Sequence, residues 1–281
     1  MACVEERDVR PPGPYRMPGA GRDGIVRRRG VALERLVHLG EEGAAVVRAW
    51  PVAGAVRLRA EAPSREVALH GLERMRFALG LDHDLGPFHR RFARDRLIAP
   101  AIRRRPWLRP RRVADPWEAL AWAITEQLIT TERAWGIQRR IVWRHGRLSP
   151  CRTLRAAPSA GQIAGRAPYE LEACDLAAKR ARAMIRAGRE VAAGRVDLER
   201  HEPAWERLRR IPHVGSWTLE KLAVGGQGRD DQLPAGDLAY VKLVGRLEGL
   251  GRRATEDEVR AFFAPYAPSG ALAALYALGA G

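Results

Sequence analysis

The pattern of hydrophobic and polar residues divides this chain into a short strand-forming part and a long helical part. Between Gly30 and Glu61, short apolar runs are separated by glycine-rich turns, which is typical of strands. The strands are expected at 31–39, 45–51 and 55–61. A helix is expected to follow, from an N-cap at Ser64 to about Leu79. The sequence therefore predicts a small α+β domain at residues 29–82.

After Gly80 the apolar residues recur at helical spacing, interrupted by Pro and Gly, and no strand is evident. Helices are expected at 86–96, 97–104, 115–130, 132–145, 152–157, 168–174, 176–193, 202–210, 216–225, 237–247, 255–264 and 269–279. The predicted fold is therefore mainly α, with one helical domain over 83–281 around a cleft. Residues 1–28 are dense in Pro, Gly and Arg and are expected to form a flexible tail.

The charge balance favours a polyanionic partner. Lys and Arg total 49 against 33 Asp and Glu, which gives a formal net charge of +16. Such a field attracts nucleic acid and predicts salt-sensitive binding. Nearly all of the excess is arginine, however, and an arginine-rich genome would produce much of the same bias. Charge alone leaves both interpretations open, so the motifs must decide.

Cysteine usage and hydropathy exclude several classes of protein. Cys3, Cys151 and Cys174 are far apart, so they indicate neither a disulfide framework nor a zinc site. Four clustered cysteines for an iron–sulfur cluster are lacking as well. The N-terminus has no apolar signal-peptide core, and no segment reaches the length of a membrane span. We expect a cytoplasmic monomer that needs no metal or organic cofactor and does not bind membranes.

Two turns carry the candidate chemistry. The first, Ile211-Pro212-His213-Val214-Gly215, opens a predicted helix and can direct backbone amides and a helix N-terminus at a phosphate. The second, Leu233-Pro234-Ala235-Gly236-Asp237, follows about 20 residues later and offers one carboxylate at the start of another helix. This order suits chemistry on a nucleotide held at the first turn.

The two turns together resemble the helix-hairpin-helix and Gly/Pro-Asp signature of base-excision DNA glycosylases. Order, spacing and flanking residues are most similar to the bacterial 3-methyladenine-DNA glycosylase II family. The resemblance covers about residues 85–275 and is strongest at 115–130 and 211–247. It implies a helical helix-hairpin-helix domain that hydrolyses the N-glycosidic bond of alkylated purines in double-stranded DNA, after flipping the damaged base out of the duplex.

The resemblance also assigns roles at the two turns. It places DNA phosphates at His213, Val214 and Gly215, with Lys221 as a further phosphate contact. His213 departs from the family, which has glycine there. Asp237 is the expected catalytic carboxylate, because one ionised acid can stabilise an oxocarbenium-like sugar or orient water. The alternative is that Asp237 only caps a helix.

The helix predicted at 115–130 is expected to end in a turn that inserts into DNA. The family resemblance assigns Leu128 as the wedge that fills the gap left by the extruded base, and Gln127 as a contact to the orphaned base or the backbone. Leu120, Ile124 and Leu128 recur every four residues, however. Burial of Leu128 in the core is therefore the alternative.

A base pocket should be lined by aromatic rings that stack on a flipped base. Trp217 is the first candidate, followed by Trp122, Tyr240 and Tyr266. A further set of tryptophans is expected in the core, namely Trp117, Trp135 and Trp143. The family's C-terminal Trp-Arg-Ser-Tyr run is missing, because Ser269 and Gly270 follow Pro268 here. This departure leaves the substrate preference open.

Strand-cleaving relatives have a nucleophilic lysine at the position of Trp217, so a monofunctional glycosylase is expected. Two alternatives remain. One is a non-catalytic protein that only binds damaged DNA. The other is a lyase-competent glycosylase for oxidised bases that uses Lys221, which lies one helical turn after Trp217.

Overall fold

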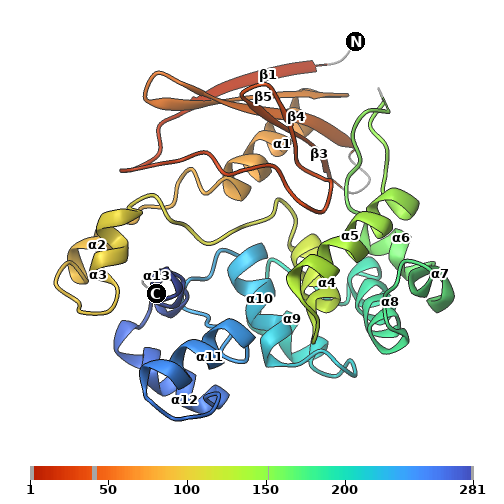
Figure 1. Cartoon of the computed structure of the whole chain (residues 1–281). Helices are drawn as coiled ribbons and strands as arrows, with labels where there is room; N and C mark the ends of the chain where they lie inside the picture. Colours follow the sequence, from red (N-terminus) through yellow and green to blue (C-terminus); the bar gives the residue numbers. More distant parts are fainter. Residues whose placement is uncertain (1–2, 40–42, 151, 280–281) are drawn as a thin grey trace.

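The computed structural model describes residues 3–39, 43–150 and 152–279, so Cys151 lies outside the described residues. Its N-terminal part is an antiparallel sheet of five strands in the order β1-β5-β4-β3-β2, drawn at the top of Figure 1. The strands are β1 (Cys3–Val9), β2 (Arg27–Arg29), β3 (Ala32–His38), β4 (Ala44–Val52) and β5 (Ala55–Ala62). The three strands predicted from the sequence, at 31–39, 45–51 and 55–61, are confirmed as β3, β4 and β5.

The expectation of a flexible tail over residues 1–28 is wrong for Cys3–Val9, which form the edge strand β1. This strand pairs with β5 from Cys3 opposite Ala62 to Val9 opposite Val56. Its charged residues hide the strand pattern, yet opposite charges on the two strands favour the pairing. The Arg57 Nε atom lies 2.7 Å from Asp8 Oδ1.

One face of the sheet is covered by α1 (Arg65–Ala78), visible directly below the strands in Figure 1. The Ser64 side chain caps this helix by accepting from the Val67 amide at 3.3 Å, as expected. Gly71 lets the helix approach the sheet closely, since a Cβ atom there would lie 2.6 Å from the Ala45 Cβ. The packed helix and sheet form the predicted α+β unit, with Leu58 and Leu72 in its core.

The remainder of the described chain is helical, as predicted. The helices are α2 (Gly86–Arg91), α3 (Ala99–Arg104), α4 (Pro116–Glu126), α5 (Thr131–His145), α6 (Ala160–Ala164), α7 (Pro168–Glu172), α8 (Ala178–Ala192), α9 (His201–Leu208), α10 (Ser216–Gly226), α11 (Leu238–Leu247), α12 (Glu256–Phe263) and α13 (Gly270–Leu278). The helix expected at 152–157 is wrong, because this segment turns back to form a bridge between Leu148 and Arg155. The short helix α6 was not predicted.

The helical part contains two hydrophobic cores. The first is built mainly by α4, α5, α8, α9 and α10, around residues such as Leu120 and Ile137. The second joins α2 and α3 to α11, α12 and α13, around Phe88 and Phe263. Figure 1 shows the yellow helices α2 and α3 beside the blue C-terminal ones. The connection from α10 to α11 therefore runs from the first core to the second.

A buried ion pair connects the sheet to the first core. Arg35 of β3 places Nη2 2.8 Å from Oε2 of Glu118 in α4, and both side chains are only 4% exposed. Burial raises the pKa of Glu118, and the Arg35 guanidinium opposes that rise. Leu36 adds an apolar contact by packing with Leu154 and Ala156.

Among the described residues, no single helix combines the length and the apolar composition needed to cross a membrane. The segments Glu256–Tyr266 and Gly270–Leu278, bent by 104°, meet those two criteria only as a pair.

Candidate functional site

The turn between α9 and α10 forms the first part of the candidate site. Ile211 and Val214 are buried and anchor this turn in the first core. His213 lies between them, is exposed, and has a φ of 70°, the left-handed conformation that favours glycine. His213 therefore adopts a left-handed backbone conformation, which has some conformational cost for a residue other than glycine. It presents its imidazole at the surface.

Helix α10 begins with backbone amides that no side chain caps. Gly215 is the N-cap residue and makes no side-chain hydrogen bond. The first amides of a helix lack partners within it, and the helix dipole favours an anion there. The segment from Gly215 to Trp217 can therefore bind a phosphate. Val214 cannot contribute its amide as expected, because that amide donates to the Ile211 carbonyl at 3.0 Å.

The loop between α4 and α5 exposes Leu128 completely. This side chain has a relative exposure of 105%, and its backbone has a φ of 56°. A branched apolar residue is disfavoured in both respects, by the left-handed backbone and by contact with water. The alternative that Leu128 packs in the core is therefore wrong.

Gln127 links the loop that carries Leu128 to the turn between α9 and α10, which is called the hairpin from here on. Its Nε2 atom donates to the His213 carbonyl at 2.7 Å and to Thr218 Oγ1 at 2.9 Å. From the other side, the Arg180 guanidinium donates to the Gln127 carbonyl at 3.0 Å. The Gln127 amide nitrogen is thus used within the protein, whereas its Oε1 atom makes no hydrogen bond to the described residues. Contact between Gln127 and DNA stays a prediction. No local pattern pointed to Arg180, which lies about 50 residues away.

Asp237 is the N-cap of α11 and accepts from the Ala239 amide at 3.0 Å through Oδ1. Its side chain is half-buried, and Oδ2 makes no hydrogen bond within the described part of the chain. The preceding turn is tight, with the Asp237 amide donating to the Pro234 carbonyl at 2.9 Å. A Cβ atom at Gly236 would meet only the end of the Glu256 side chain, 2.6 Å from Oε1, which can shift away. Capping therefore uses one carboxylate oxygen and leaves the other free.

Lys221 connects the hairpin helix to Asp237. Its Nζ atom lies 3.1 Å from Glu126 Oε2 and 5.5 Å from the centre of the Trp217 ring, which confirms that Trp217 and Lys221 share one helical face. Burial lowers the pKa of Lys221, but the Glu126 and Asp237 carboxylates raise it above its ordinary value. The ammonium ion therefore lies in the field of both acids. Glu126 was missed in the sequence, although it directly precedes Gln127.

The aromatic candidates separate into two groups. Trp217 is half-buried, and Tyr240 lies one turn from Asp237. Burial raises the pKa of Tyr240, and the charge of Asp237 raises it further. Trp122 and Tyr266 are only 6% and 8% exposed and belong to the two cores. Their expected place in a base pocket is therefore wrong. Tyr266 instead donates a hydrogen bond to Asp95 at 3.0 Å, with its pKa raised to about 12 by burial and by this bond.

Three tryptophans were expected in the core, with different outcomes. Trp117 is buried and donates its indole N–H to the Pro158 carbonyl at 3.0 Å. Trp135 is half-buried beneath Arg22. Trp143 is 68% exposed, with the Arg155 guanidinium 4.6 Å from its ring centre, so the core prediction is wrong for this residue.

Within the described ranges, no cluster of three or more His, Cys, Asp or Glu side chains could hold a metal ion.

Comparison with known proteins supports the sequence resemblance. No family model matches this chain. A DNA-3-methyladenine glycosylase of Bacillus subtilis is 24% identical over 193 residues, which are 66% of this chain and 64% of that protein. The match thus spans slightly less than two thirds of the curated relative.

Solved structures show the same fold over nearly the whole chain. The 3-methyladenine DNA glycosylase of Archaeoglobus fulgidus superimposes with a TM-score of 0.80 and 18% identity, covering 98% of this chain and 97% of its own. An 8-oxoguanine glycosylase/lyase of Clostridium acetobutylicum has a TM-score of 0.68 and 14% identity, covering 92% and 99%. The chain is a homologue of a DNA-3-methyladenine glycosylase and has the fold of the helix-hairpin-helix glycosylases.

Proposed function

We propose that this protein is a DNA glycosylase that removes damaged bases from duplex DNA, with Asp237 as its catalytic carboxylate. The observation that carries this proposal is the position of Asp237. Its half-buried carboxylate starts α11 and acts electrostatically on Lys221, which packs against Trp217 of the hairpin helix. A nucleotide whose phosphate binds at the hairpin would therefore have its sugar near an anionic oxygen.

The chemistry that fits one free carboxylate oxygen is hydrolysis of an N-glycosidic bond. The C1′–N bond breaks, and its electron pair leaves with the base, so positive charge develops on the sugar. Asp237 Oδ2 stabilises that charge. A water molecule adds to C1′ and releases one proton to the solvent, which leaves the neutral free base and an abasic site with a C1′ hydroxyl. Nucleotides of 3-methyladenine and 7-methylguanine carry a cationic base that departs without prior protonation, so the second acid that O-glycosidases use is not required.

Leu128 fits the role of a plug for the vacated base position. A fully exposed leucine on a loop that Gln127 and Arg180 hold in place is withdrawn from water only when it enters the DNA stack. An inserted apolar side chain replaces part of the stacking that disappears when a nucleotide flips out.

The same geometry favours a monofunctional enzyme over a lyase. A Schiff base requires an amine with a free electron pair. Trp217 occupies the position of the family's nucleophilic lysine, and Lys221 is held as an ammonium ion by Glu126. The raised pKa of Lys221 keeps its electron pair protonated at neutral pH. We therefore infer that base removal does not proceed to strand cleavage.

Within damaged bases, we propose alkylated purines, with 3-methyladenine first. The support is the sequence similarity to a DNA-3-methyladenine glycosylase. We assign Trp217 as the aromatic wall of a base pocket, because Trp122 and Tyr266 are buried in the cores. Tyr240, near Asp237, is the other half-buried candidate. Stacking on an aromatic ring contributes roughly 1–3 kcal/mol per base. Cationic bases that leave easily depend less on a second wall than neutral bases do.

A base-release assay over a panel of duplexes tests the proposal. The panel contains 3-methyladenine, 7-methylguanine, hypoxanthine and 8-oxoguanine, each under single-turnover conditions. We expect release of the two methylated purines, slower release of hypoxanthine, and uncut abasic strands. Binding without release of any base would indicate a damage-binding protein. Release of 8-oxoguanine with strand cleavage would instead support the lyase alternative.

A further inference from the structure

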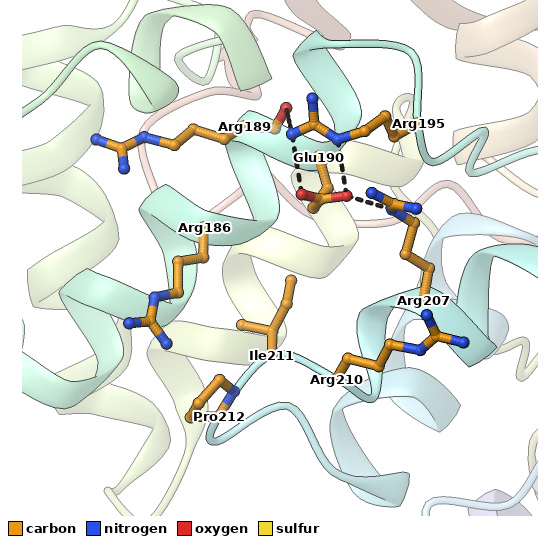
Figure 2. Close-up of a pocket in the computed structure, with 8 residues that line it drawn as sticks. All are labelled: Arg186, Arg189, Glu190, Arg195, Arg207, Arg210, Ile211 and Pro212. Carbon is orange, nitrogen blue, oxygen red and sulfur yellow. Dashed lines mark hydrogen bonds and ion pairs between the residues drawn. The ribbon is translucent and has the colours of Figure 1, made fainter.

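A pocket lined mostly by arginines lies next to the hairpin and has no part in the proposed chemistry. It has a volume of about 300 Å³ and is formed by α8, the segment after it, α9 and the start of the hairpin turn. Figure 2 shows its lining residues, which are Arg186, Arg189, Glu190, Arg195, Arg207, Arg210, Ile211 and Pro212. Five arginines and one glutamate give this arginine pocket a net charge of +4.

Two of the arginines are held by the single acid. Glu190 lies 2.9 Å from Arg195 Nη2 and also pairs closely with Arg207, as the dashed lines in Figure 2 show. Hydrogen bonds from these two arginines lower the pKa of Glu190 to about 2. The carboxylate therefore stays ionised at physiological pH, and it orients one side of the pocket instead of binding a ligand.

The other arginines are poorly neutralised. Arg186 has no hydrogen-bond or ion-pair partner among residues 3–39, 43–150 and 152–279. Among the described residues, the Arg210 side chain pairs only with Glu206, at 3.2 Å, and both of these side chains are more than 70% exposed. Such an exposed pair is weak, because water and salt screen it. In Figure 2, Arg186 and Arg210 lie on either side of Ile211 and Pro212.

We propose that the arginine pocket binds a phosphate group of the DNA backbone, adjacent to the phosphate held at the hairpin. The proposal rests on the proposed function, in that it requires the chain to bind duplex DNA. Arginine guanidinium groups bind phosphate oxygens in a planar, bidentate manner, and the lining offers two guanidinium groups, Arg186 and Arg210, that are poorly neutralised within the protein.

The position of the pocket explains why DNA would supply the phosphate. Ile211 and Pro212 line the pocket and also begin the turn that leads to the uncapped amides after Gly215. Successive phosphates on one strand follow one another by roughly 3.4 Å along the duplex axis. Because the pocket and the amides share one turn, we infer that a strand anchored at the amides places a neighbouring phosphate at the pocket.

Salt-dependent DNA binding tests this site. The dissociation constant for an undamaged duplex is measured over a series of NaCl concentrations for wild type, Arg186→Ala/Arg210→Ala, and the charge-preserving Arg186→Lys/Arg210→Lys. Arg29→Ala/Arg65→Ala is the matched control, because it removes two exposed arginines from the sheet domain. Thermal unfolding verifies that each variant is folded.

We expect the double alanine variant to bind about tenfold more weakly, with a salt slope smaller by about 1 for each phosphate that the protein no longer neutralises. The lysine variant should retain most of the slope, and the control should match wild type. An equal loss of affinity in the control would show that only overall charge matters, and an unchanged slope would remove the pocket from the DNA interface. Either result overturns the proposal.

A second arm distinguishes a free polyphosphate from DNA. Calorimetric titration with inorganic tripolyphosphate should give no binding at low micromolar concentrations. Tight tripolyphosphate binding that the double alanine variant abolishes, together with an unchanged DNA slope, would assign the pocket to a free anion and overturn the DNA assignment. Base release is scored separately. If the wild type releases no base but the double alanine variant has a reduced salt slope, only the glycosylase proposal is refuted. If the wild type releases base normally but the variant has an unchanged salt slope, only the proposed phosphate site is refuted.

Discussion

At the scale of single residues, the site combines conformations and exposures that folding alone disfavours. His213 and Leu128 both have positive φ angles, and Leu128 is fully exposed. Strained or exposed residues of this kind persist where the surrounding structure holds them, and they concentrate at functional sites. Gln127 supplies that support here, because it bonds to the His213 carbonyl from the residue next to Leu128.

Leu128→Ala should weaken binding to a duplex that contains an abasic site, and leave binding to intact duplex nearly unchanged. The inserted leucine contributes by apolar burial, so the affinity should fall by about tenfold or more. The free energy of unfolding should change by less than about 0.5 kcal/mol, because the side chain is exposed. Leu247→Ala, in another exposed leucine, serves as the control. An equal decrease in affinity for both duplexes would argue against the wedge role.

Borohydride should trap no covalent adduct between this protein and damaged DNA. Trapping requires an imine, and the Lys221 ammonium group is paired with Glu126 at 3.1 Å, which opposes the proton loss that imine formation needs. The measurement is a denaturing gel after incubation with borohydride, with Lys221→Ala as the matched variant. A trapped band that disappears in this variant would establish the lyase alternative.

At the scale of elements, the buried pair between Arg35 of β3 and Glu118 of α4 fixes the sheet to the helical part. Arg35→Ala should lower the free energy of unfolding by about 3–5 kcal/mol, since it leaves an unpaired carboxyl in the interior. The double variant Arg35→Met/Glu118→Met should be destabilised much less. Thermal and urea unfolding provide the measurement. Equal destabilisation of the two variants would show that the unpaired buried charge is not the cause of the loss in the free energy of unfolding.

How far the elements could be predicted depended on how local their signals were. Ser64 caps its helix as expected, and apolar alternation located the three central strands. The edge strand β1 was missed because its register comes from pairing with β5 and from charges such as Asp8 opposite Arg57, which are 49 residues apart. Segment 152–157 was rich enough in alanine and arginine to suggest a helix, but tertiary contacts override such propensity.

The same distinction applies to the candidate site. Asp237, Trp217 and Lys221 could be found because local turns and helical spacing place them. Glu126 and the links through Gln127 could not, because they depend on contacts between α4 and the hairpin more than 80 residues later. Aromatic identity alone also did not distinguish the buried Trp122 from the exposed Trp143.

At the scale of the whole molecule, the two helical cores position the proposed chemistry. The hairpin helix α10 belongs to the first core, whereas the residues before Asp237 and the helix that it caps belong to the second. The segment that joins the two cores therefore places the Asp237 carboxylate near α10, the helix of Trp217 and Lys221. The arginine pocket adjoins the start of the hairpin turn and does not include Asp237 among its lining residues. Binding and bond cleavage should thus be separable by mutation.

The central claim is that the Asp237 carboxylate drives base release. The most direct measurement is the single-turnover rate of 3-methyladenine release by wild type and by Asp237→Asn, with duplex affinity determined in parallel. Asparagine keeps the shape and can still cap α11, so folding and affinity should remain close to wild type. Removal of the charge should slow release by about a hundredfold or more. Release by Asp237→Asn at the wild-type rate would contradict the account.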